Sequence, residues 1–265
     1  MKAVAFDLDD TLLHDDLSVS QYTLNILHSL RKLGIYLIPS SGRAQMSMKP
    51  FLDILDCATF YISCNGAEIW DGKSHRLIRR ELFSEETAKE IARFGNRHSC
   101  YSQTYDGDKF LFSEYSVWAK KYADTSMLTG EYVGNLEEYI HGPLYKILMM
   151  VDESKIASML NEAQKQFAGK VSVTCSKPYF LEFNPLEATK GIAIRRVSDM
   201  LHIDTSDIIA FGDSLNDLSM LQTAGVSVVV SNGRNDVKPY CTAVCGSNNN
   251  DGVAHYLADY FSLRG

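Results

Sequence analysis

Two carboxylates and a hydroxyl follow the first apolar segment of the chain at intervals of two residues. The apolar residues 4–6 lead into Asp7, Asp9 and Thr11. Side chains two residues apart lie on the same face of an extended segment, so the two acids can point at one place. Such crowding is unfavourable unless a cation neutralises the acids. The pattern therefore indicates a cation site, although Asp and Thr also cap helices and turns.

Polar side chains also follow the later apolar segments, each of which is short enough to be a strand. After the predicted strands at 35–38, 60–64, 207–211 and 226–230 stand Ser41, Gly42, Arg43, Asn65, Asp213, Asn216, Asp217 and Asn232. Lys190 begins the predicted helix 189–201, which leads into the strand 207–211. Ligands of doubly wound parallel sheets bind at the carboxyl ends of the strands, so these side chains are expected to converge.

The residue types in this set suit a magnesium ion and a phosphate group. Carboxylates are the oxygen ligands that Mg²⁺ prefers, and this ion keeps waters that it shares with phosphates. The hydroxyl of Ser41, the ammonium of Lys190 and backbone amides suit phosphate oxygens. Each residue alone has an ordinary explanation as a turn former, a helix cap or a surface charge, and Arg43 fits a surface position as well as a site. Their occurrence together, each at a strand end, favours the site.

Several other classes of function have no support in the sequence. It contains no Cys/His cluster at zinc spacing, no Walker lysine loop and no Gly-x-Gly-x-x-Gly or Gly-x-Ser-x-Gly motif. A net charge of −7 argues against a general nucleic-acid binder. No apolar run approaches the roughly 18 residues of a membrane span, and the first residues do not form a signal peptide. A cytoplasmic protein is expected, and nothing indicates an obligate protein partner.

Strands and helices alternate in the first and last parts of the chain. Leucines recur at helical spacing between the predicted strands 3–8 and 35–38, and the alternation continues to about residue 81. It returns from residue 189 to the predicted last helix, which begins near residue 251. This order predicts an α/β protein with a Rossmann-like, doubly wound parallel sheet. Residues 1–81 and 188–265 are predicted to form this discontinuous core.

The middle of the chain has a different pattern. Short predicted strands at 100–104 and 109–112 flank Asp106-Gly107, and those at 171–175 and 179–183 flank Lys177-Pro178. Tight turns of this kind join antiparallel strands. Helices are predicted from Ser84 and over 153–168, whereas the aromatic stretch 114–140 carries no clear pattern. Residues 82–187 are therefore predicted to form an inserted α+β domain.

The polar segments resemble the four motifs of the haloacid dehalogenase superfamily. These are Asp7-x-Asp9-x-Thr11, Ser41 before Gly42-Arg43, Lys190-Gly191, and Gly212-Asp213-x-x-Asn216-Asp217. The place of the insert, between the second and third motifs, is similar to the Cof-type subfamily with its C2B cap. The resemblance covers essentially the whole chain. Asp10 stands where this family often has Gly, and Ser41 stands where Thr is common.

The resemblance implies a Mg²⁺-dependent phosphatase of small phosphorylated metabolites, such as sugar phosphates or phosphorylated cofactors. Asp7 would attack phosphorus to form an aspartyl-phosphate, and Asp9 would act as the general acid and base. Ser41 and Lys190 would hold the phosphoryl oxygens, with Asp213, Asp217, Asp7 and the Asp9 carbonyl at the metal. Substrate contacts are expected from Thr11, Gly42, Arg43, Asn65 and Asn216.

Two other functions remain open on this sequence. A phosphosugar mutase of the same fold would return the phosphoryl group to a sugar, and would need more cations in the cap to hold a bisphosphate. A Mg²⁺- or phosphate-binding regulatory module would have no turnover, but the acid at Asp9 argues against it. Side chains of the cap that choose the substrate have no signature, and Lys146, Tyr179 and Glu182 are only loose candidates.

Overall fold

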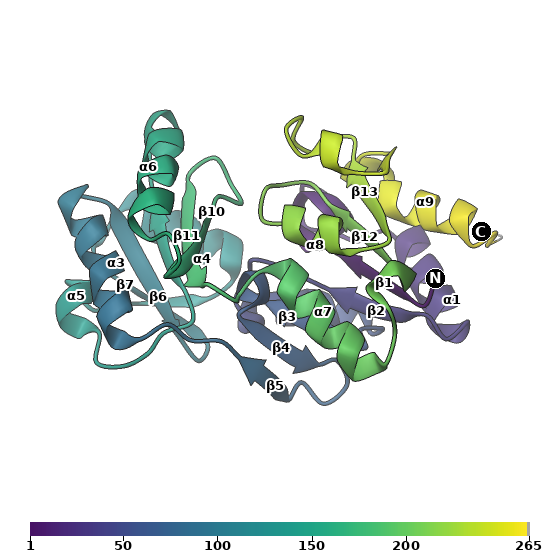
Figure 1. The fold of residues 1–265 in the computed structure, drawn as a ribbon, viewed down its shortest axis with the longest axis horizontal. Coiled ribbons are helices and arrows are strands. Elements are labelled where there is room, and N and C mark those ends of the chain that lie inside the picture. Colours follow the sequence, from purple (N-terminus) through teal and green to yellow (C-terminus); the bar gives the residue numbers. More distant parts are fainter. Residues whose placement is uncertain (264–265) are drawn as a thin grey trace.

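A five-stranded parallel sheet carries both ends of the chain (Figure 1). The computed structural model describes residues 1–263. The strand order is β14-β13-β12-β1-β2, and every neighbouring pair is parallel. The strands are β1 (Ala3–Phe6), β2 (Tyr36–Pro39), β12 (Ile208–Gly212), β13 (Val226–Val230) and β14 (Ala243–Cys245). The predicted doubly wound α/β sheet is thereby confirmed.

Helices cover both faces of this sheet because its strands are apolar on both sides. Val4 and Phe6 of β1 pack with α1 (Gln21–Lys32), α2 (Gln45–Leu55) and α9 (Gly252–Tyr260). Ala3 and Ala5, which alternate with them, pack with α7 (Lys190–Leu201) and α8 (Leu218–Thr223). Among the described residues, no helix is long and apolar enough to cross a membrane.

The third predicted strand belongs to a different sheet from the one expected. β3 (Phe60–Ser63) pairs antiparallel with β4 (Glu68–Asp71), which pairs antiparallel with β5 (Leu77–Arg80). β3 nevertheless lies parallel to β2, through a bridge between Ser40 and Ile62 and backbone hydrogen bonds from Ser41 to Ile62 and from Thr59 to Leu37. The prediction that β3 continues the parallel sheet is therefore met only in part: β3 runs beside β2, but its full strand partner is β4, which was not predicted as a strand.

The first strand also ends earlier than predicted. β1 ends at Phe6, and Leu8–Leu12 form a short irregular helical turn instead of extending the strand to residue 8. Asp10 has a φ of 57° within this turn. This left-handed conformation favours Gly and is tolerated by Asp. The turn bends the chain directly after Asp7, so Asp7 and Asp9 do not continue along a straight strand.

The segment between β5 and α7 builds a six-stranded sheet in the order β10-β11-β9-β6-β7-β8. Its strands are β6 (Tyr101–Asp106), β7 (Lys109–Phe112), β8 (Thr129–Tyr132), β9 (Ile147–Met150), β10 (Val171–Thr174) and β11 (Phe180–Pro185). The pairs β6–β7 and β10–β11 are antiparallel, as predicted, whereas β7 and β8 are parallel. The unassigned stretch 114–140 contains α4 (Val117–Ser126), β8 and α5 (Leu136–Tyr139). We call this segment the cap, and its predicted boundaries near residues 82 and 187 stay a prediction.

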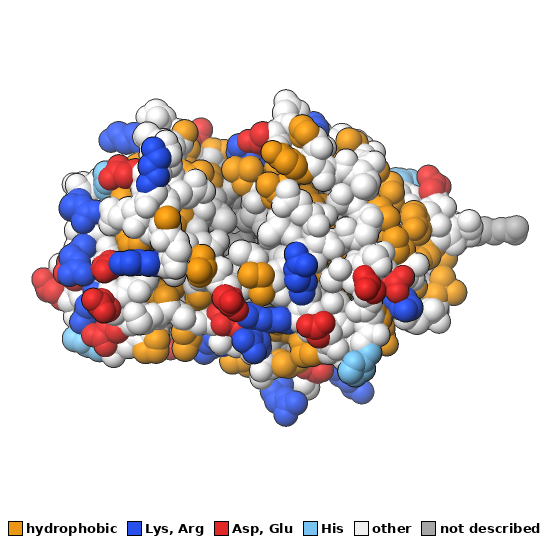
Figure 2. Space-filling view, in the orientation of Figure 1, with side chains coloured by type: hydrophobic (Ala, Val, Ile, Leu, Met, Phe, Trp, Pro, Cys, Tyr) orange, Lys and Arg blue, Asp and Glu red, His pale blue; other side chains and the backbone are white. Residues whose placement is uncertain are grey.

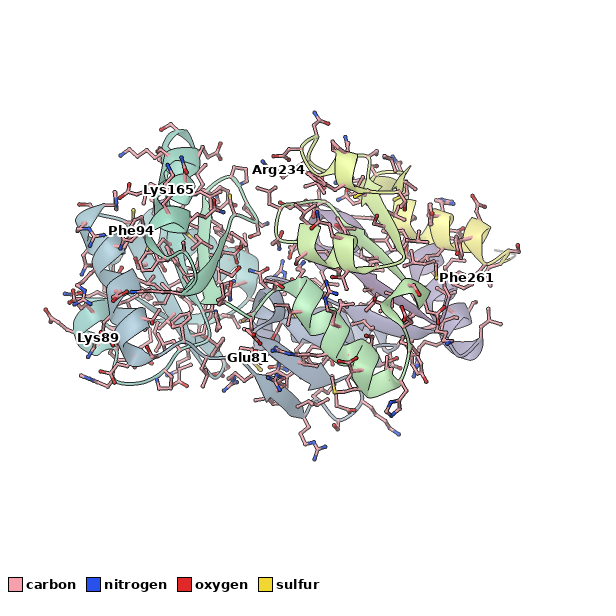
Figure 3. The ribbon with its side chains drawn as sticks, in the orientation of Figure 1. Glu81, Lys89, Phe94, Lys165, Arg234 and Phe261 are labelled. Atoms are coloured by element: carbon pink, nitrogen blue, oxygen red, sulfur yellow. The ribbon has the colours of Figure 1, made fainter. Side chains whose placement is uncertain are left out.

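One face of the cap sheet is covered by two helices, which leaves the other face for the core. α3 (Glu85–Arg97) and α6 (Glu153–Gln166) pack on one side, and Figure 3 labels Phe94 on α3. The ring of Phe94 meets those of Phe167 and Phe183 edge-on. The opposite side carries a second apolar cluster with Tyr105, Tyr122 and Leu148. Because α3 and α6 shield the first face, the second is the one that can border a site between cap and core.

Candidate active site

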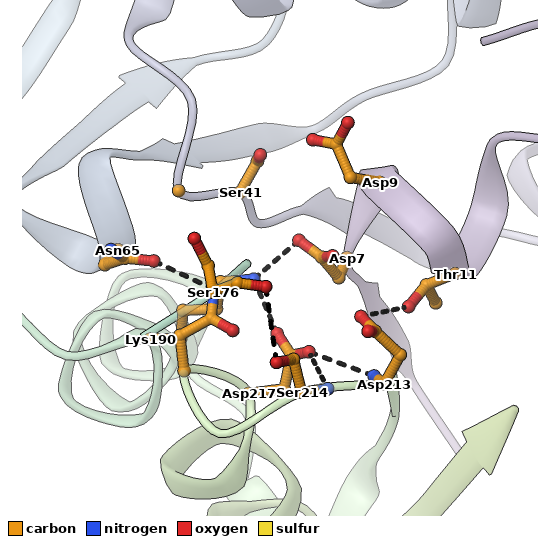
Figure 4. A network of polar contacts seen from close by, with 12 residues as sticks. Asp7, Asp9, Thr11, Ser41, Asn65, Ser176, Lys190, Asp213, Ser214 and Asp217 are labelled. Atoms are coloured by element: carbon orange, nitrogen blue, oxygen red, sulfur yellow. Dashed lines mark hydrogen bonds and ion pairs between the residues drawn. The ribbon is translucent and has the colours of Figure 1, made fainter. Parts of the chain in front are cut away.

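Lys190 connects two of the predicted metal-binding acids at the edge of the parallel sheet (Figure 4). Its Nζ lies 2.6 Å from Oδ1 of Asp7 and 2.5 Å from Oδ1 of Asp217. The Lys190 side chain is fully buried, so these ion pairs are shielded from solvent. Thr189 caps the helix by accepting a hydrogen bond from the amide of Ile192, which places Lys190 in the first turn of α7. Three segments far apart in sequence therefore meet at one ammonium group.

Asp213 and Asp217 are positioned by the turn that follows β12. The amides of Asp213 and Ser214 each donate to Oδ2 of Asp217 at 3.0 Å, which fixes this buried carboxylate. Thr11 donates its hydroxyl to Oδ1 of Asp213 at 3.1 Å. Thr11 was predicted to contact substrate, but its hydroxyl is used within the protein and its side chain does not line the cavity described below. Its observed contact is one that orients Asp213.

Asp7, Asp213 and Asp217 form a group that fits a divalent cation. Each offers one carboxylate oxygen, and these oxygens all lie within 4.8 Å of one another. Burial, together with the charges of Asp217 and Asp9, raises the pKa of Asp7 to about 8 in spite of Lys190. Burial and the charges of Asp217 and Asp7 raise the pKa of Asp213 as well. One ammonium does not neutralise three acids, so the group has room for a further positive charge.

Asp9 makes a two-point ion pair with Arg43 instead of pointing at Asp7. Nε and Nη2 of Arg43 donate to the two carboxylate oxygens of Asp9 at 2.8 and 2.7 Å. Arg43 also donates to Ser47 and to the carbonyl of Thr125 in the cap. Burial raises the pKa of Asp9, but the charge and hydrogen bonds of Arg43 outweigh it and hold that pKa below its usual value. Arg43, which the sequence left undecided, thus lies in the site as the partner of Asp9.

Ser41 and Gly42 lie in the loop after β2 and border the same space. Ser41 is buried and its hydroxyl oxygen accepts from the amide of Arg43 at 3.1 Å. A Cβ added at Gly42 would lie 2.9 Å from Oδ1 of Asn65, so a larger residue would push against this side chain. The loop therefore requires a small residue between the hydroxyl of Ser41 and the guanidinium of Arg43.

Asn65 and Asn216 are held by each other, and of the two only Asn216 borders the cavity described below. Nδ2 of Asn216 donates to Oδ1 of Asn65 at 3.0 Å, and Asn65 donates to Asn184 of the cap at 3.3 Å. Gly66 follows in a left-handed conformation, where a Cβ would lie 2.3 Å from the carbonyl oxygen of Thr189. This close approach seats Asn65 beside the start of α7. Asn232 was the least certain of the predicted site residues. Its Nδ2 donates to the carbonyl oxygen of Asp10 at 2.7 Å and so stabilises the turn after Asp7.

A cavity of about 640 Å³, counting its part open to solvent, lies between core and cap. Figure 2 shows the surface hollowed where the two halves of the molecule meet. Core residues on its wall include Asp7, Asp9, Asp10, Ser41, Gly42, Arg43, Asp213 and Asn216. Cap residues include Tyr122, Thr125, Lys146, Leu148, Ser176, Lys177, Phe180 and Glu182. Lys190 and Asp217 lie behind this wall, because neither borders the space.

Sequence reasoning missed several of these cap residues. Lys177 was read only as part of a turn, yet its charge acts on Asp9 and Asp10 across the cavity. Ser176, beside it, accepts from the hydroxyl of Ser214 through its carbonyl at 3.5 Å. Lys146 and Glu182 border the cavity, whereas Tyr179 is not among its wall residues and stacks on Trp118. No signal in one sequence shows which side of a cap strand faces the core.

Comparison with known proteins shows which family has this fold. The family model of the haloacid dehalogenase-like hydrolases matches residues 4–257. The chain belongs to this family. The predicted Cof-type membership agrees with this match. A relative from Bacillus subtilis, named 5-amino-6-(5-phospho-D-ribitylamino)uracil phosphatase YwtE, is 29% identical over 99% of both chains. Phosphatase YwpJ of the same organism is 30% identical over 97% of this chain and 99% of the relative.

Solved structures of the family have the same fold. A haloacid dehalogenase-like hydrolase from B. subtilis is 28% identical, with a TM-score of 0.87 over 97% of this chain and 99% of that one. A second, from Bacteroides thetaiotaomicron, is 26% identical with a TM-score of 0.85, and covers 98% and 99% of the two chains. Coverage this complete includes the cap as well as the core.

Proposed function

We propose that this hydrolase cleaves phosphate monoesters of small metabolites through an aspartyl-phosphate on Asp7. The chain is a phosphoric monoester hydrolase, in agreement with the names of its relatives. The observation that carries the proposed chemistry is the single ammonium of Lys190 held between Asp7 and Asp217, with Asp213 within reach. A carboxylate at the cavity wall, backed by a buried cation and facing a cation site, is suited to attack phosphorus.

The proposed cofactor is Mg²⁺, held by Asp7, Asp213 and Asp217 with the backbone carbonyl of Asp9. When bound, this ion reduces the repulsion between the phosphate and the acids and polarises a phosphoryl oxygen. The three carboxylates offer only oxygen ligands, which suit a hard cation. A bound cation would also offset the repulsion between these neighbouring acids. Thr11 and the amides of the β12 turn keep Asp213 and Asp217 in place for this purpose.

Asp7, Lys190 and Ser41 are the residues proposed to act on the phosphoryl group. Lys190 keeps Asp7 oriented and holds positive charge behind it, where negative charge accumulates during transfer. Ser41 offers its hydroxyl hydrogen to a phosphoryl oxygen, since its oxygen already accepts from the amide of Arg43. Asn216 borders the same space and is fixed by Asn65, so it positions neighbouring groups without bearing charge.

Asp9 is proposed to move the proton in both halves of the reaction. A phosphate dianion in the cavity repels the Asp9 carboxylate and competes for Arg43, and both effects raise the pKa of Asp9. The protonated acid then donates to the leaving oxygen. After the leaving group departs, Asp9 accepts a proton from the water that hydrolyses the aspartyl-phosphate. Arg43 favours this second state because it stabilises the ionised carboxylate.

The cavity supports a small substrate over a macromolecular one. It is walled by side chains of both core and cap, as sites for small molecules between two domains are. One relative is named for a substrate with a phosphorylated ribityl chain, which supports the proposal of a small phosphorylated metabolite. The mutase alternative is less well supported, because Lys146, a buried cation of the cap, already pairs with Glu182 and is not free to hold a second phosphate. A regulatory module without turnover is disfavoured by the complete set of acids.

Replacing Asp9 with Asn is expected to lower kcat by about 10²–10⁴-fold, the usual contribution of a general acid or base. The loss should be larger for glycerol phosphate than for p-nitrophenyl phosphate, because p-nitrophenolate leaves without a proton. Steady-state kinetics on the two esters measures the difference. An equal loss on both would argue against proton donation by Asp9 and for a purely structural role beside Arg43.

Removal of divalent cations with EDTA is expected to abolish activity, and added Mg²⁺ should restore it. The apparent affinity for Mg²⁺ should rise with pH through pH 8, because Asp7 and Asp213, whose pKa values are both raised, must lose their protons before they bind the ion. Mg²⁺ at 100 times its Kd should stabilise the fold by about 2.7 kcal/mol. Thermal unfolding at several pH values and Mg²⁺ concentrations measures both effects. Full activity in EDTA would contradict the assigned cofactor.

A further inference from the structure

Lys146 of the cap is joined to the core loop that carries Ser41, and the chemistry proposed above gives it no part. Its Nζ donates to the carbonyl oxygen of Gly42 at 2.6 Å and lies 2.5 Å from Oε1 of Glu182. Lys146 is 3% exposed and Glu182 is 1% exposed, so water does not compete for either contact. The inference that follows rests on the proposed phosphatase function, because it concerns how Ser41 meets the phosphate.

Lys146 is held firmly within the cap sheet. It directly precedes β9, and its carbonyl oxygen accepts from the hydroxyl of Thr104 on the neighbouring strand β6 at 2.8 Å. Its ion-pair partner, Glu182, lies on β11, the strand on the other side of β9. Burial opposes the charge of Lys146, but the carboxylate of Glu182 outweighs it and holds the pKa of Lys146 above its usual value. Lys146 is therefore a charged donor in a fixed place.

The peptide group between Gly42 and Arg43 connects Lys146 to Ser41. Its carbonyl oxygen accepts from Lys146, and its N–H, the amide of Arg43, donates to Oγ of Ser41 at 3.1 Å. This peptide is trans and planar, so its C=O and N–H point in opposite directions and turn together. The ammonium that holds the carbonyl therefore also sets the direction of the N–H that reaches Ser41.

The backbone on both sides of this peptide group is held by the core. The amide of Ser41 donates to the carbonyl of Ile62 at 2.9 Å. The carbonyl of Arg43 accepts from the amide of Cys64 at 2.9 Å. Between these two fixed points the peptide plane can still rotate, and Gly42 opposes such a rotation less than any other residue type would. A contact to the carbonyl oxygen, which the cap provides, prevents this rotation.

We propose that Lys146 is a positioning residue that orients the hydroxyl of Ser41 toward the phosphate through the peptide group of Gly42 and Arg43. An ammonium at the carbonyl oxygen polarises the peptide, which strengthens the hydrogen bond from its N–H to Oγ of Ser41. With its oxygen occupied in this way, the hydroxyl directs its hydrogen to a phosphoryl oxygen. Because Lys146 belongs to the cap, the arrangement is complete only when the cap lies on the core.

A direct contact between Lys146 and the leaving group is the competing explanation, since Lys146 also borders the cavity. Two of its three N–H donors are committed to Gly42 and Glu182, which favours the action through the peptide. The two explanations differ in what they predict for different esters. Action through Ser41 affects the phosphate that all substrates share, whereas a direct contact depends on the leaving group.

A double-mutant cycle in the intact protein with Mg²⁺ tests this connection. Lys146→Met alone would leave Glu182 buried without its partner, so it is combined with Glu182→Met, and we call the pair the uncoupled variant. Ser41→Ala should lower kcat/KM for p-nitrophenyl phosphate by about 10²-fold, as loss of one donor to the reacting group does. The uncoupled variant should lower it by about tenfold. Combining the two should cost no more than Ser41→Ala alone.

Inorganic phosphate gives a second measurement that does not depend on turnover. Its inhibition constant should rise by about tenfold in Ser41→Ala and in the uncoupled variant, and no further when the two are combined. The loss of kcat/KM in the uncoupled variant should be equal for p-nitrophenyl phosphate and glycerol phosphate. The matched control is Lys109→Met with Glu131→Met, because these residues form a 2.7 Å ion pair on the exposed strands β7 and β8 of the same sheet. This control should leave every constant unchanged.

Three results would overturn the inference by itself. Losses that add when the uncoupled variant is combined with Ser41→Ala would show that Lys146 acts without Ser41. Losses that differ between the two esters would place Lys146 at the leaving group, and unchanged kinetics in the uncoupled variant would leave it without a role. Absence of hydrolysis of both esters by the wild type would instead overturn the proposed function, and this inference with it.

Discussion

Replacing Asp7 with Asn is expected to lower hydrolysis of p-nitrophenyl phosphate by at least about 10⁴-fold, as loss of a covalent nucleophile does in other enzymes. The fold should survive, because an Asn oxygen can still accept from Lys190. Without metal, the variant should be as stable as the wild type or more stable at pH 8 and above. The folded-state pKa of Asp7 is raised to about 8, so its ionised form opposes folding at high pH, and Asn removes that charge.

Asp10→Asn is the matched control for this substitution. Asp10 lies in the same turn, borders the cavity and has no assigned role, and Asn tolerates its φ of 57°. Its activity should stay within about threefold of the wild type, as expected for a residue outside the transfer chemistry. Activity of Asp7→Asn close to that of the wild type would remove Asp7 as the nucleophile. A loss of the same size in both variants would point to the turn rather than to the carboxylate.

Replacing Lys190 with Met is expected to affect activity and stability together. It leaves Asp7 and Asp217 buried without their ammonium partner, which should lower the free energy of unfolding of the metal-free protein by about 3–5 kcal/mol. For a chain of this size that corresponds to roughly 10 °C in Tm. The kcat should fall by at least about 10³-fold, because positive charge behind the transferred phosphoryl group is lost.

The pH dependence of Lys190→Met follows from the acids that remain. Their pKa values rise further without Lys190, so protonation relieves the repulsion, and the stability deficit should shrink as pH falls from 8 to 5. Added Mg²⁺ should raise the Tm of the variant by more than that of the wild type. Thermal unfolding at several pH values, with and without Mg²⁺, measures both trends. A deficit that does not change with pH would mean that Lys190 acts through packing and not through its charge.

The convergence of Asp7, Lys190, Asp213 and Asp217 could be expected from the sequence alone. The short apolar segments read as parallel strands, and the carboxyl ends of parallel strands share one edge of a sheet. The residues that follow these strands must therefore lie close together, and this can be inferred without knowing any side-chain contact. The same reasoning predicted the doubly wound sheet. The helix predicted to begin at Ser84 is also confirmed, and Ser84 accepts a hydrogen bond from the amide of Thr87.

The partners of individual site residues could not be expected in the same way. Arg43 is 34 positions from Asp9, and Thr11 is 202 positions from Asp213, so no local pattern links them. Their pairing depends on the irregular turn at Leu8–Leu12, which aims Asp9 toward the β2 loop and Thr11 back toward the β12 turn. A straight strand through residue 8, as predicted, would have aimed these side chains differently.

The sequence by itself determined the family, the order of the motifs and the acids that gather at the edge of the sheet, because these depend on local patterns and on the geometry of parallel strands. Only the tertiary structure decided what the cap offers to a substrate. Lys146 directly precedes β9 and Glu182 lies on β11, in a mostly antiparallel sheet where either face can be the buried one. Which face meets the core depends on α3 and α6 covering the other, and that is settled by packing between distant segments.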